Sequence, residues 1–223
     1  MAADDASLAA VLDAAAAAQG LRLDDAARAR LAAYVALVRK WGRIANLTGD
    51  TTAAVFAREQ VTDCLAVVPH AGHGRLLDIG SGNGLPGIVL AIARPDLEVT
   101  LLEPRAKRAR FLTQARIELE LPNVTVVEAR VEDHHPALPY DTLIARAVAA
   151  LPALMAAARH LLHPGARLLA MKGQVAPSDL ALPEVTPTAV DSHRLVVPGY
   201  AARHLVVVHG AGLAPATPKG FVP

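Results

Sequence analysis

Short apolar runs alternate with longer helical stretches from residue 75 onward, and this alternation limits the fold more than any other feature of the sequence. The runs predict strands at 76–79, 99–102, 124–127, 142–144, 168–171 and 205–208, with helices at 85–93, 105–119 and 152–162. A strand, a helix and a further strand in succession favour parallel strands whose connecting helices cover the sheet. We therefore expect an α/β fold with a mostly parallel sheet, in which ligands bind beyond the carboxyl ends of the strands.

The first seventy residues have a helical pattern instead. An alanine-rich helix over 4–19 is expected to end at Gly20, and a second helix begins near Asp24, with Trp41 in its apolar series and therefore in the core. A third helix is expected over 52–68. This pattern divides the chain into a helical extension over 1–70, a ligand-binding domain over 71–213 and a loose carboxyl terminus over 214–223.

The bulk properties of the chain bound its class. Its 223 residues suit one domain with an appendage, and the net charge of +1 neither requires nor excludes a nucleic-acid partner. No apolar run approaches the roughly 20 residues of a membrane span. Asp4 and Asp5 occupy the place where a signal peptide would be positively charged, and Cys64 is the single cysteine. We expect a cytoplasmic protein without a membrane segment and, since His134 and His135 lack companion ligands, without a metal.

The candidate site begins with the loop Asp78-Ile79-Gly80-Ser81-Gly82-Asn83-Gly84, directly after the first strand. Glycines at Gly80, Gly82 and Gly84 let the backbone turn and approach a ligand, and the following helix directs free N–H groups into the loop. Glu103 lies nineteen residues after Gly84, at the end of the second strand, where it can accept hydrogen bonds from ribose hydroxyls. Loop and acid together predict an adenosine-containing ligand.

The same loop permits a second interpretation. Gly82, Gly84 and Gly87 match the dinucleotide fingerprint G-x-G-x-x-G, so the glycines alone do not separate NAD from S-adenosylmethionine. Asp78 favours the latter, because a carboxylate opposes a pyrophosphate but suits a positively charged amino group and sulfonium. An NAD-dependent enzyme and a loop that serves packing only remain as alternatives.

The acceptor chemistry is narrowed by what the sequence lacks. There is no D/N-P-P-Y/F/W motif for amino-group methylation, and Cys64 precedes the first strand, which disfavours it as a nucleophile. An acceptor that needs neither deprotonation nor covalent activation, such as guanine N7, requires mainly positioning and exclusion of water. Arg146 at a strand end suits a carboxylate or a phosphate. The helix with Lys107, Arg108 and Arg110 either contacts phosphates or is a solvated face.

Several motifs resemble one bacterial family. They are Trp41, Asn46-Leu47-Thr48, Leu77 to Gly87, Lys107 to Leu112, Arg130-Val131-Glu132, Arg146-Ala147, Lys172-Gly173-Gln174 and Arg203 to Val207. This set is similar to the RsmG family, also called glucose-inhibited division protein B. The resemblance implies a class I, Rossmann-like methyltransferase with a mostly parallel seven-stranded sheet, helices on both faces and an amino-terminal helical extension. It also implies in-line transfer of a methyl group from S-adenosyl-L-methionine to guanine N7 of 16S ribosomal RNA.

The resemblance assigns roles to individual residues. It places cofactor contacts at Gly80, Leu85, Val131, Glu132 and Arg146, in addition to Asp78, Gly82, Gly84 and Glu103. RNA contacts are expected at Arg130, Lys172 and Arg203, of which the last two position the acceptor without a general base. The expected partner of a monomeric protein is 16S ribosomal RNA or the small ribosomal subunit. A methyltransferase for a small molecule and a non-catalytic ribosome-associated module remain as alternatives.

Overall fold

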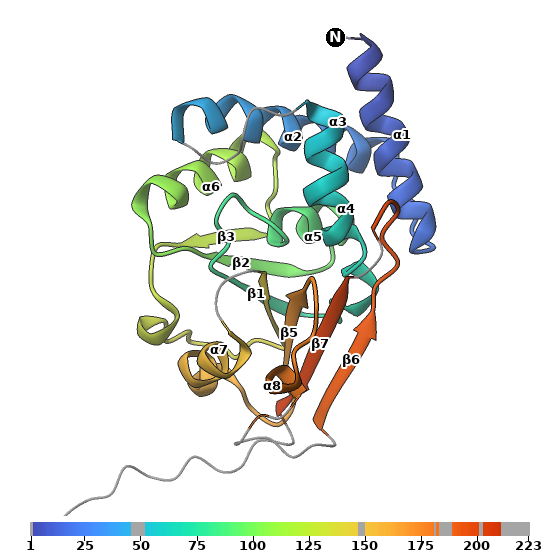
Figure 1. Ribbon diagram of the computed structural model, residues 1–223. Coiled ribbons are helices and arrows are strands. Elements are labelled where there is room, and N and C mark those ends of the chain that lie inside the picture. The colour runs from blue at the N-terminus through green and yellow to red at the C-terminus, as the bar shows by residue number, and fades with distance from the viewer. Residues whose placement is uncertain are drawn as a thin grey trace, which may run out of the picture.

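The computed structural model describes residues 2–45, 52–146, 150–180, 182, 189–200 and 203–210. Its centre is one seven-stranded sheet with the order β3-β2-β1-β4-β5-β7-β6 (Figure 1). The strands are β1 Arg75–Ile79, β2 Glu98–Leu102, β3 Val124–Val127, β4 Thr142–Arg146, β5 Arg167–Lys172, β6 Val190–Arg194 and β7 His204–His209. Strands β1 to β5 are parallel, whereas β7 runs antiparallel to both β5 and β6. The predicted mostly parallel α/β sheet is confirmed.

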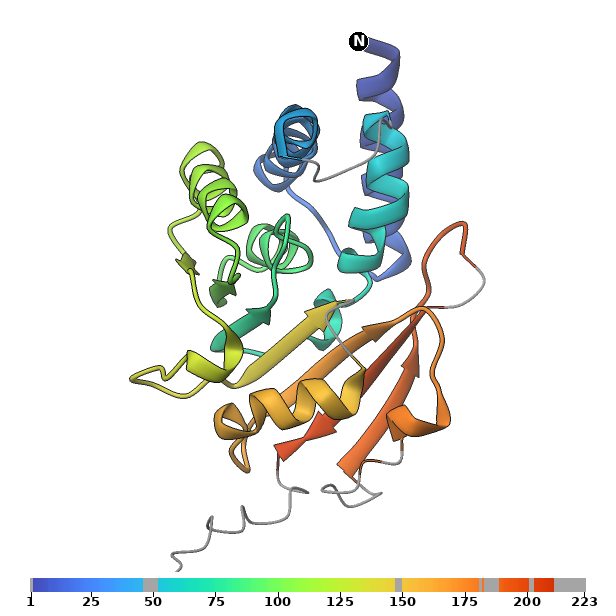
Figure 2. The same ribbon diagram turned by 60° about the vertical axis from the view of Figure 1, so that its left-hand side comes forward.

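Helices cover both faces of this sheet. They are α1 Ala2–Ala18, α2 Asp25–Ala45, α3 Ala53–Phe56, α4 Thr62–Leu65, α5 Gly87–Ala93, α6 Ala106–Glu118, α7 Leu151–Ala158 and α8 Pro177–Leu180. A π-helical segment, η1 Ala57–Val61, joins α3 to α4, and 3₁₀ turns form at Val68–His70, Val131–Asp133 and Arg159–Leu161. Helices α1 to α6 lie on one side of the sheet, and α7 lies on the other (Figure 2).

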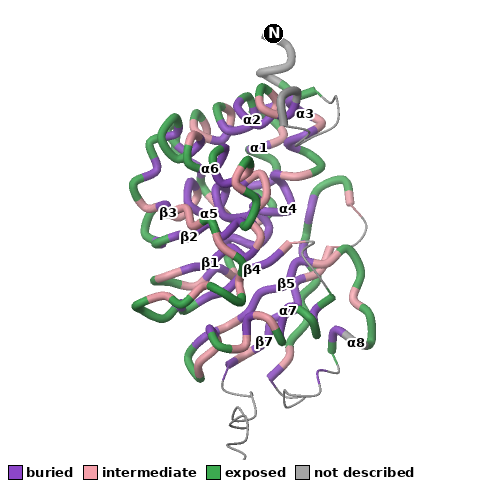
Figure 3. Tube along the Cα trace, turned by 90° about the vertical axis from the view of Figure 1, so that its left-hand side faces the viewer, coloured by how far each residue is buried: buried purple, intermediate pink, exposed green. Residues whose placement is uncertain are grey.

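The strands alternate their side chains between two cores. Leu76 points into the core shared with the amino-terminal helices, whereas its neighbour Leu77 points into the core beneath α7. The central strands are buried along most of their length (Figure 3). This burial explains why they read as continuous apolar runs in the sequence.

The amino-terminal helices share their core with the sheet. Leu31 and Val38 of α2 are fully buried in the same cluster as residues of β1 and β2. The ring of Trp41 meets the ring of Phe111 of α6 edge-on at 5.6 Å, which confirms the predicted packing of Trp41. The division of the chain at residue 70 stays a prediction.

The structure departs from the sequence-based elements in four places. The helix expected over 52–68 is α-helical at Ala53–Phe56 and Thr62–Leu65, with the π-helical segment Ala57–Val61 between them. Strand β6 was not predicted, because four of its five residues are exposed and it has no apolar run. The helix expected over 152–162 ends at Ala158 and continues as a 3₁₀ turn. The helix expected from residue 85 begins at Gly87. The predicted loose terminus at 214–223 and the Asn46-Leu47-Thr48 motif lie outside the described residues. Among the helices that are described, none is both long and apolar enough to cross a membrane.

Candidate active site

The glycine loop leaves β1 in a left-handed conformation, with φ angles of 69° at Gly80, 60° at Gly82 and 94° at Gly84. Gly82 is not tightly packed, since a Cβ built on it would have no neighbouring heavy atom closer than 3.8 Å. A Cβ on Gly84 would instead lie 2.4 Å from Cδ1 of Ile88. Gly82 therefore leaves room for a ligand, whereas Gly84 permits close packing of the loop against α5.

Glu103 is tied directly to this loop. Its Oε2 accepts a hydrogen bond from the backbone N–H of Gly82 at 2.9 Å, and its Oε1 accepts one from the N–H of Arg105 at 3.0 Å. The side chain is fixed at the end of β2 and is buried. Each carboxylate oxygen retains a second lone pair, so the acid has the acceptors that two ribose hydroxyls require.

Asp78 is the unusual group of the site. It is only 1% exposed, and its Oδ2 accepts a hydrogen bond from the N–H of Gly87 at 3.0 Å. Its Oδ1 is buried and has no hydrogen-bond partner within the described part of the chain. Burial raises the pKa of Asp78 to about 7. A buried carboxylate oxygen without a partner calls for a donor from outside the protein. The ammonium group of S-adenosylmethionine can donate to it, and the positive charge of the sulfonium suits a carboxylate nearby.

Arg146 links the loop to the other half of the site. It ends β4, next to β1, and its Nη1 donates a hydrogen bond to Oε1 of Gln60 at 2.9 Å. Its charge also lowers the pKa of Asp78, against the larger effect of burial. Arg146 therefore lies close to the Asp78 carboxylate and also lines the adjoining cavity.

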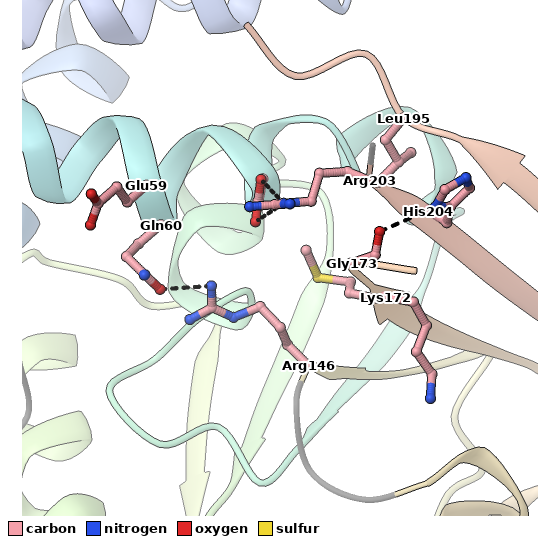
Figure 4. A pocket seen from close by; sticks show the side chains of 10 residues that line it. Glu59, Gln60, Arg146, Lys172, Gly173, Leu195, Arg203 and His204 are labelled. Carbon is pink, nitrogen blue, oxygen red and sulfur yellow. Dashed lines mark hydrogen bonds and ion pairs between the residues drawn. The ribbon is translucent and has the colours of Figure 1, made fainter. Parts of the chain in front are cut away.

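That cavity has a volume of about 390 Å³. Its walls come from the η1–α4 helix, from the carboxyl ends of β4 and β5 and from the start of β7, and they include Gln60, Asp63, Arg146, Met171, Lys172, Leu195 and Arg203. The structure thus brings together three predicted site residues that are far apart in sequence. Arg146 and Arg203 extend toward the same helix, whereas the side chain of Lys172 extends in another direction (Figure 4).

Both remaining cations have a carboxylate partner. Nε of Arg203 lies 3.0 Å from Oδ2 and 3.1 Å from Oδ1 of Asp63, and its guanidinium stacks over the ring of Tyr200 at 4.2 Å. Nζ of Lys172 lies 2.9 Å from Oδ1 of Asp179. Burial raises the pKa of Asp63, while its hydrogen bond from Arg203 and the charge of that arginine act in the opposite direction. Asp63 and Arg203 therefore form a mutually dependent pair.

The structure places the segment after β3 elsewhere. Arg130 and Glu132 are exposed and Val131 is half-buried, and none of the three lines the cavity with Lys172 and Arg203. Leu85 is buried in the core beside the loop. The cofactor and RNA roles of these residues stay predictions.

Sequence reasoning missed Gln60, Asp63 and Tyr34. The first two lie in a helical stretch, where polar residues at such positions usually face water. Tyr34 belongs to the apolar series of α2, yet its hydroxyl donates a hydrogen bond to the carbonyl oxygen of Asn83 at 2.8 Å. It is fully buried. Helix α2 is thus anchored to the glycine loop.

Tyr34→Phe is expected to raise the dissociation constant for S-adenosylmethionine about 2- to 10-fold, because one net hydrogen bond contributes about 0.5–1.5 kcal/mol to holding the loop. Tyr140→Phe is the matched control. Tyr140 is also buried, at 2% exposure, and its hydroxyl bonds Nε2 of His134 at 2.9 Å, away from the loop. Calorimetric titration and thermal unfolding of both variants check the prediction. Equal affinities in both would show that Tyr34 has only a structural role.

Cys64 behaves as a small core residue. It is fully buried, and burial raises the pKa of its thiol to about 12. A thiol in this state is a poor nucleophile at neutral pH, in agreement with the sequence-based expectation. In the part of the chain that the structure describes, no three His, Cys, Asp or Glu side chains are grouped so that they could hold a metal ion.

Known proteins resemble this chain in sequence. The family model described as GidB, rRNA small subunit methyltransferase G, matches residues 27–206. A protein of Methylobacillus flagellatus called ribosomal RNA small subunit methyltransferase G is 43% identical over 188 residues, which cover 84% of this chain and 91% of the relative. A protein of Aromatoleum aromaticum with the same name is 45% identical over 195 residues, covering 85% and 92%.

Solved structures resemble the fold. The S-adenosylmethionine-dependent methyltransferase SibL in its apo form has a TM-score of 0.55 at 19% identity, covering 81% of this chain and 69% of its own. A putative O-methyltransferase from Klebsiella pneumoniae has a TM-score of 0.53 at 16% identity, covering 79% and 89%. At these identities the likeness concerns the fold alone, and it confirms the predicted class I methyltransferase architecture.

Proposed function

The chain belongs to the GidB family, rRNA small subunit methyltransferase G, and we propose that it transfers a methyl group from S-adenosyl-L-methionine to N7 of a guanine in 16S ribosomal RNA. Family membership confirms the methyl-transfer activity and the cofactor that the sequence motifs predicted. The bound cofactor supplies an electrophilic methyl group on a positively charged sulfur.

The cofactor crevice supports this function from one side. The unpartnered Oδ1 of Asp78 suits the cationic end of the cofactor, and the fixed carboxylate of Glu103 suits its ribose. Gly80 and Gly82 form a turn of positive φ between these two acids, and a Cβ on Gly82 would meet no heavy atom closer than 3.8 Å. We assign the adenine side to Val131 and Glu132 beyond β3 and the carboxylate of the methionine moiety to Arg146.

The adjoining cavity supports the proposal from the other side. The observation that carries the proposal is that Arg146 lines this cavity while its charge also lowers the pKa of Asp78. Guanine N7 has a lone pair and no proton to lose, so its methylation calls for positioning and for exclusion of water rather than for a general base. Arg203 supplies a fixed donor in the cavity wall, Lys172 adds a positive charge at its edge, and Met171 and Leu195 supply apolar surface for a base. Arg130 contacts RNA outside the cavity.

The proposed partner is 16S ribosomal RNA, as naked RNA or within the small subunit, and the proposed working form is a cytoplasmic monomer. Near-neutral charge over the whole chain, +1 from 22 basic and 21 acidic residues, is compatible with an RNA substrate only if the basic residues are clustered. Such a cluster of basic residues lies on α2 and α6, beside the cofactor crevice.

The purified protein is expected to label small ribosomal subunits or their RNA from S-adenosylmethionine with a radioactive methyl group. Digestion to nucleosides should recover the label as 7-methylguanosine. Label on another atom would contradict the N7 assignment. Activity that survives ribonuclease treatment would support a small-molecule substrate, and tight cofactor binding without turnover on any ribosomal particle would support a non-catalytic module.

A further inference from the structure

Basic residues are concentrated on two neighbouring helices of the cofactor side. Helix α2 carries Arg39 and Lys40 near its carboxyl end, and the segment at the start and along α6 carries Arg105, Lys107, Arg108, Arg110 and Arg116. No aspartate or glutamate occurs in residues 26–45 or 104–117. Because the whole chain has a net charge of only +1, this local excess is a feature of these two segments rather than of the composition.

The two segments lie side by side. The contact of the Trp41 ring with the Phe111 ring joins α2 to α6, and Lys40 and Arg110 are the sequence neighbours of those two rings. The Nε of Arg30, nearer the start of α2, donates a hydrogen bond to the carbonyl oxygen of Leu119 at the far end of α6. The helices therefore run in opposite directions, and both views show them adjacent (Figures 1 and 2). We call the exposed side chains of Lys40, Arg105, Lys107 and Arg110 the α2–α6 basic surface. Arg116 follows Lys107 by nine residues and therefore lies on the opposite side of α6.

This surface is continuous with the cofactor crevice. The N–H of Arg105, at the start of α6, donates to Oε1 of Glu103. A Cβ built on Gly82 would lie 3.9 Å from Nη1 of Arg108. A polyanion that lies on α6 is thus held next to the place where the methyl donor binds.

We propose that the α2–α6 basic surface docks the phosphate backbone of the substrate RNA, an inference that rests on the proposed function. Helix α6 has 13 residues and is about 20 Å long, and along a duplex each strand presents one phosphate per roughly 3.4 Å. Several consecutive phosphates therefore fit along it. Charges on exposed lysine and arginine side chains bind such a backbone without reading its sequence. The basic surface would thus hold the RNA, while the cavity lined by Arg146 and Arg203 would receive a single base.

An anionic membrane would also attract cations, but the apolar side of α6 is not available to it. Phe111 and Leu112 are fully buried in the protein core, and Ile117, at 61% exposure, is an isolated exposed apolar residue on this helix. Interfacial helices bury an apolar face in the lipid. Because α6 is positively charged but presents no exposed apolar face, RNA is favoured over a membrane as the partner of this surface.

The test is the salt dependence of RNA binding by the double variant Lys40→Gln/Arg110→Gln. Each lost phosphate contact reduces the slope of log K against log salt by about 0.7–0.9, so the variant should lose about 1.4–1.8 from the slope for binding to small ribosomal subunits. Its affinity for S-adenosylhomocysteine should equal that of the wild type, which shows that the crevice is intact. The matched control, Arg22→Gln/Arg159→Gln, removes the same charge elsewhere and should keep the wild-type slope.

An unchanged slope in the first variant, or an equal decrease in the control, would overturn the proposal. Loss of binding to anionic vesicles with unchanged RNA binding would also overturn it, in favour of a membrane. The outcome is separable from that of the proposed function. If the variants show the expected difference in slope but the wild type places no label on N7, the proposed function is refuted and the RNA-docking surface stands. If the wild type labels N7 but the Lys40→Gln/Arg110→Gln variant has the wild-type slope, the function stands and the docking surface is refuted.

Discussion

Asp78→Asn is expected to stabilise the ligand-free protein at pH 8 and, at the same time, to weaken its binding of S-adenosylmethionine about 10- to 100-fold. The stabilisation follows from the pKa of Asp78, which burial raises from 3.8 to about 7. An acid whose pKa is higher in the folded chain contributes stability fully below pH 3.8, and that contribution is lost as the pH rises through about 7. At pH 8 the buried carboxylate thus lowers the free energy of unfolding by at most about 4 kcal/mol. The uncharged amide of asparagine does not have this unfavourable effect.

The loss of affinity follows from the same charge. A hydrogen bond to a charged group contributes about 1.5–3 kcal/mol, and Oδ1 of Asp78 has no partner for it among the described residues. Because the cationic ligand prefers the ionised carboxylate, wild-type affinity should fall as the pH drops below about 7. Between pH 7.5 and pH 6 the decrease should be roughly eightfold, the factor that a free-protein pKa near 7 gives.

Thermal unfolding and calorimetric titration from pH 5 to pH 8 check both effects. Asp78→Asn should exceed wild-type stability at pH 8, and this difference should shrink steadily toward pH 5, because it disappears only below pH 3.8, where the side chain is protonated in the unfolded chain as well. Its binding should lack the decrease below pH 7, which also separates the titration of Asp78 from that of the ligand. Asp191→Asn, at an exposed carboxylate of the edge strand, should leave cofactor affinity unchanged, and it should alter stability only through the loss of its surface contact with His209. A variant that binds the cofactor with wild-type affinity would remove Asp78 from the cofactor site.

The buried half of the fold could be predicted because its signal is local. Strands such as β1, flanked on both sides by other strands and covered by helices, are buried along most of their length and carry a short apolar run, and Gly82 and Glu103 follow where strands of this kind end. Edge strand β6 has no such signal. It pairs on one side only, and its residues Asp191 to Arg194 are exposed, so β7 and not its own apolarity holds it in the sheet.

The sequence could predict the parts of the site that follow single strands, but not the contacts that join distant segments. The cavity joins residues 60 and 63 to residues 146, 172 and 203 through the folding of the whole chain. In the sequence, Asp63 is one polar residue in a helix; its importance comes from the Arg203 guanidinium, which is 140 residues away. The same holds for Tyr34, whose hydroxyl meets the glycine loop only after α2 packs on α5. The family resemblance therefore pointed to Arg203 and Lys172, but the sequence could not predict the carboxylates with which they pair.

Arg203→Ala is expected to lower the rate of RNA methylation about 100-fold, a loss typical of a misplaced substrate, while affinity for S-adenosylmethionine stays within about twofold. The reason is its place in the cavity, with its Nε held by Asp63 and its guanidinium over Tyr200. The variant also leaves the Asp63 carboxylate, 9% exposed, without this partner, and an uncompensated buried charge is destabilising. Losing the arginine removes an influence that lowers the pKa of Asp63, so the stability deficit should grow as the pH rises.

A second variant distinguishes a role in catalysis from mere charge balance. Asp63→Asn/Arg203→Ala removes both charges and should recover most of the stability at pH 8, because no unpaired carboxylate remains. It should not recover methylation, since the donor that faces the acceptor is still missing. Single-turnover methylation of small subunits, cofactor titration and thermal unfolding of the single and double variants give all three readouts. Recovery of activity together with stability would show that Arg203 serves only to neutralise Asp63, and the positioning of the acceptor would then have to rest on Lys172 and Arg146.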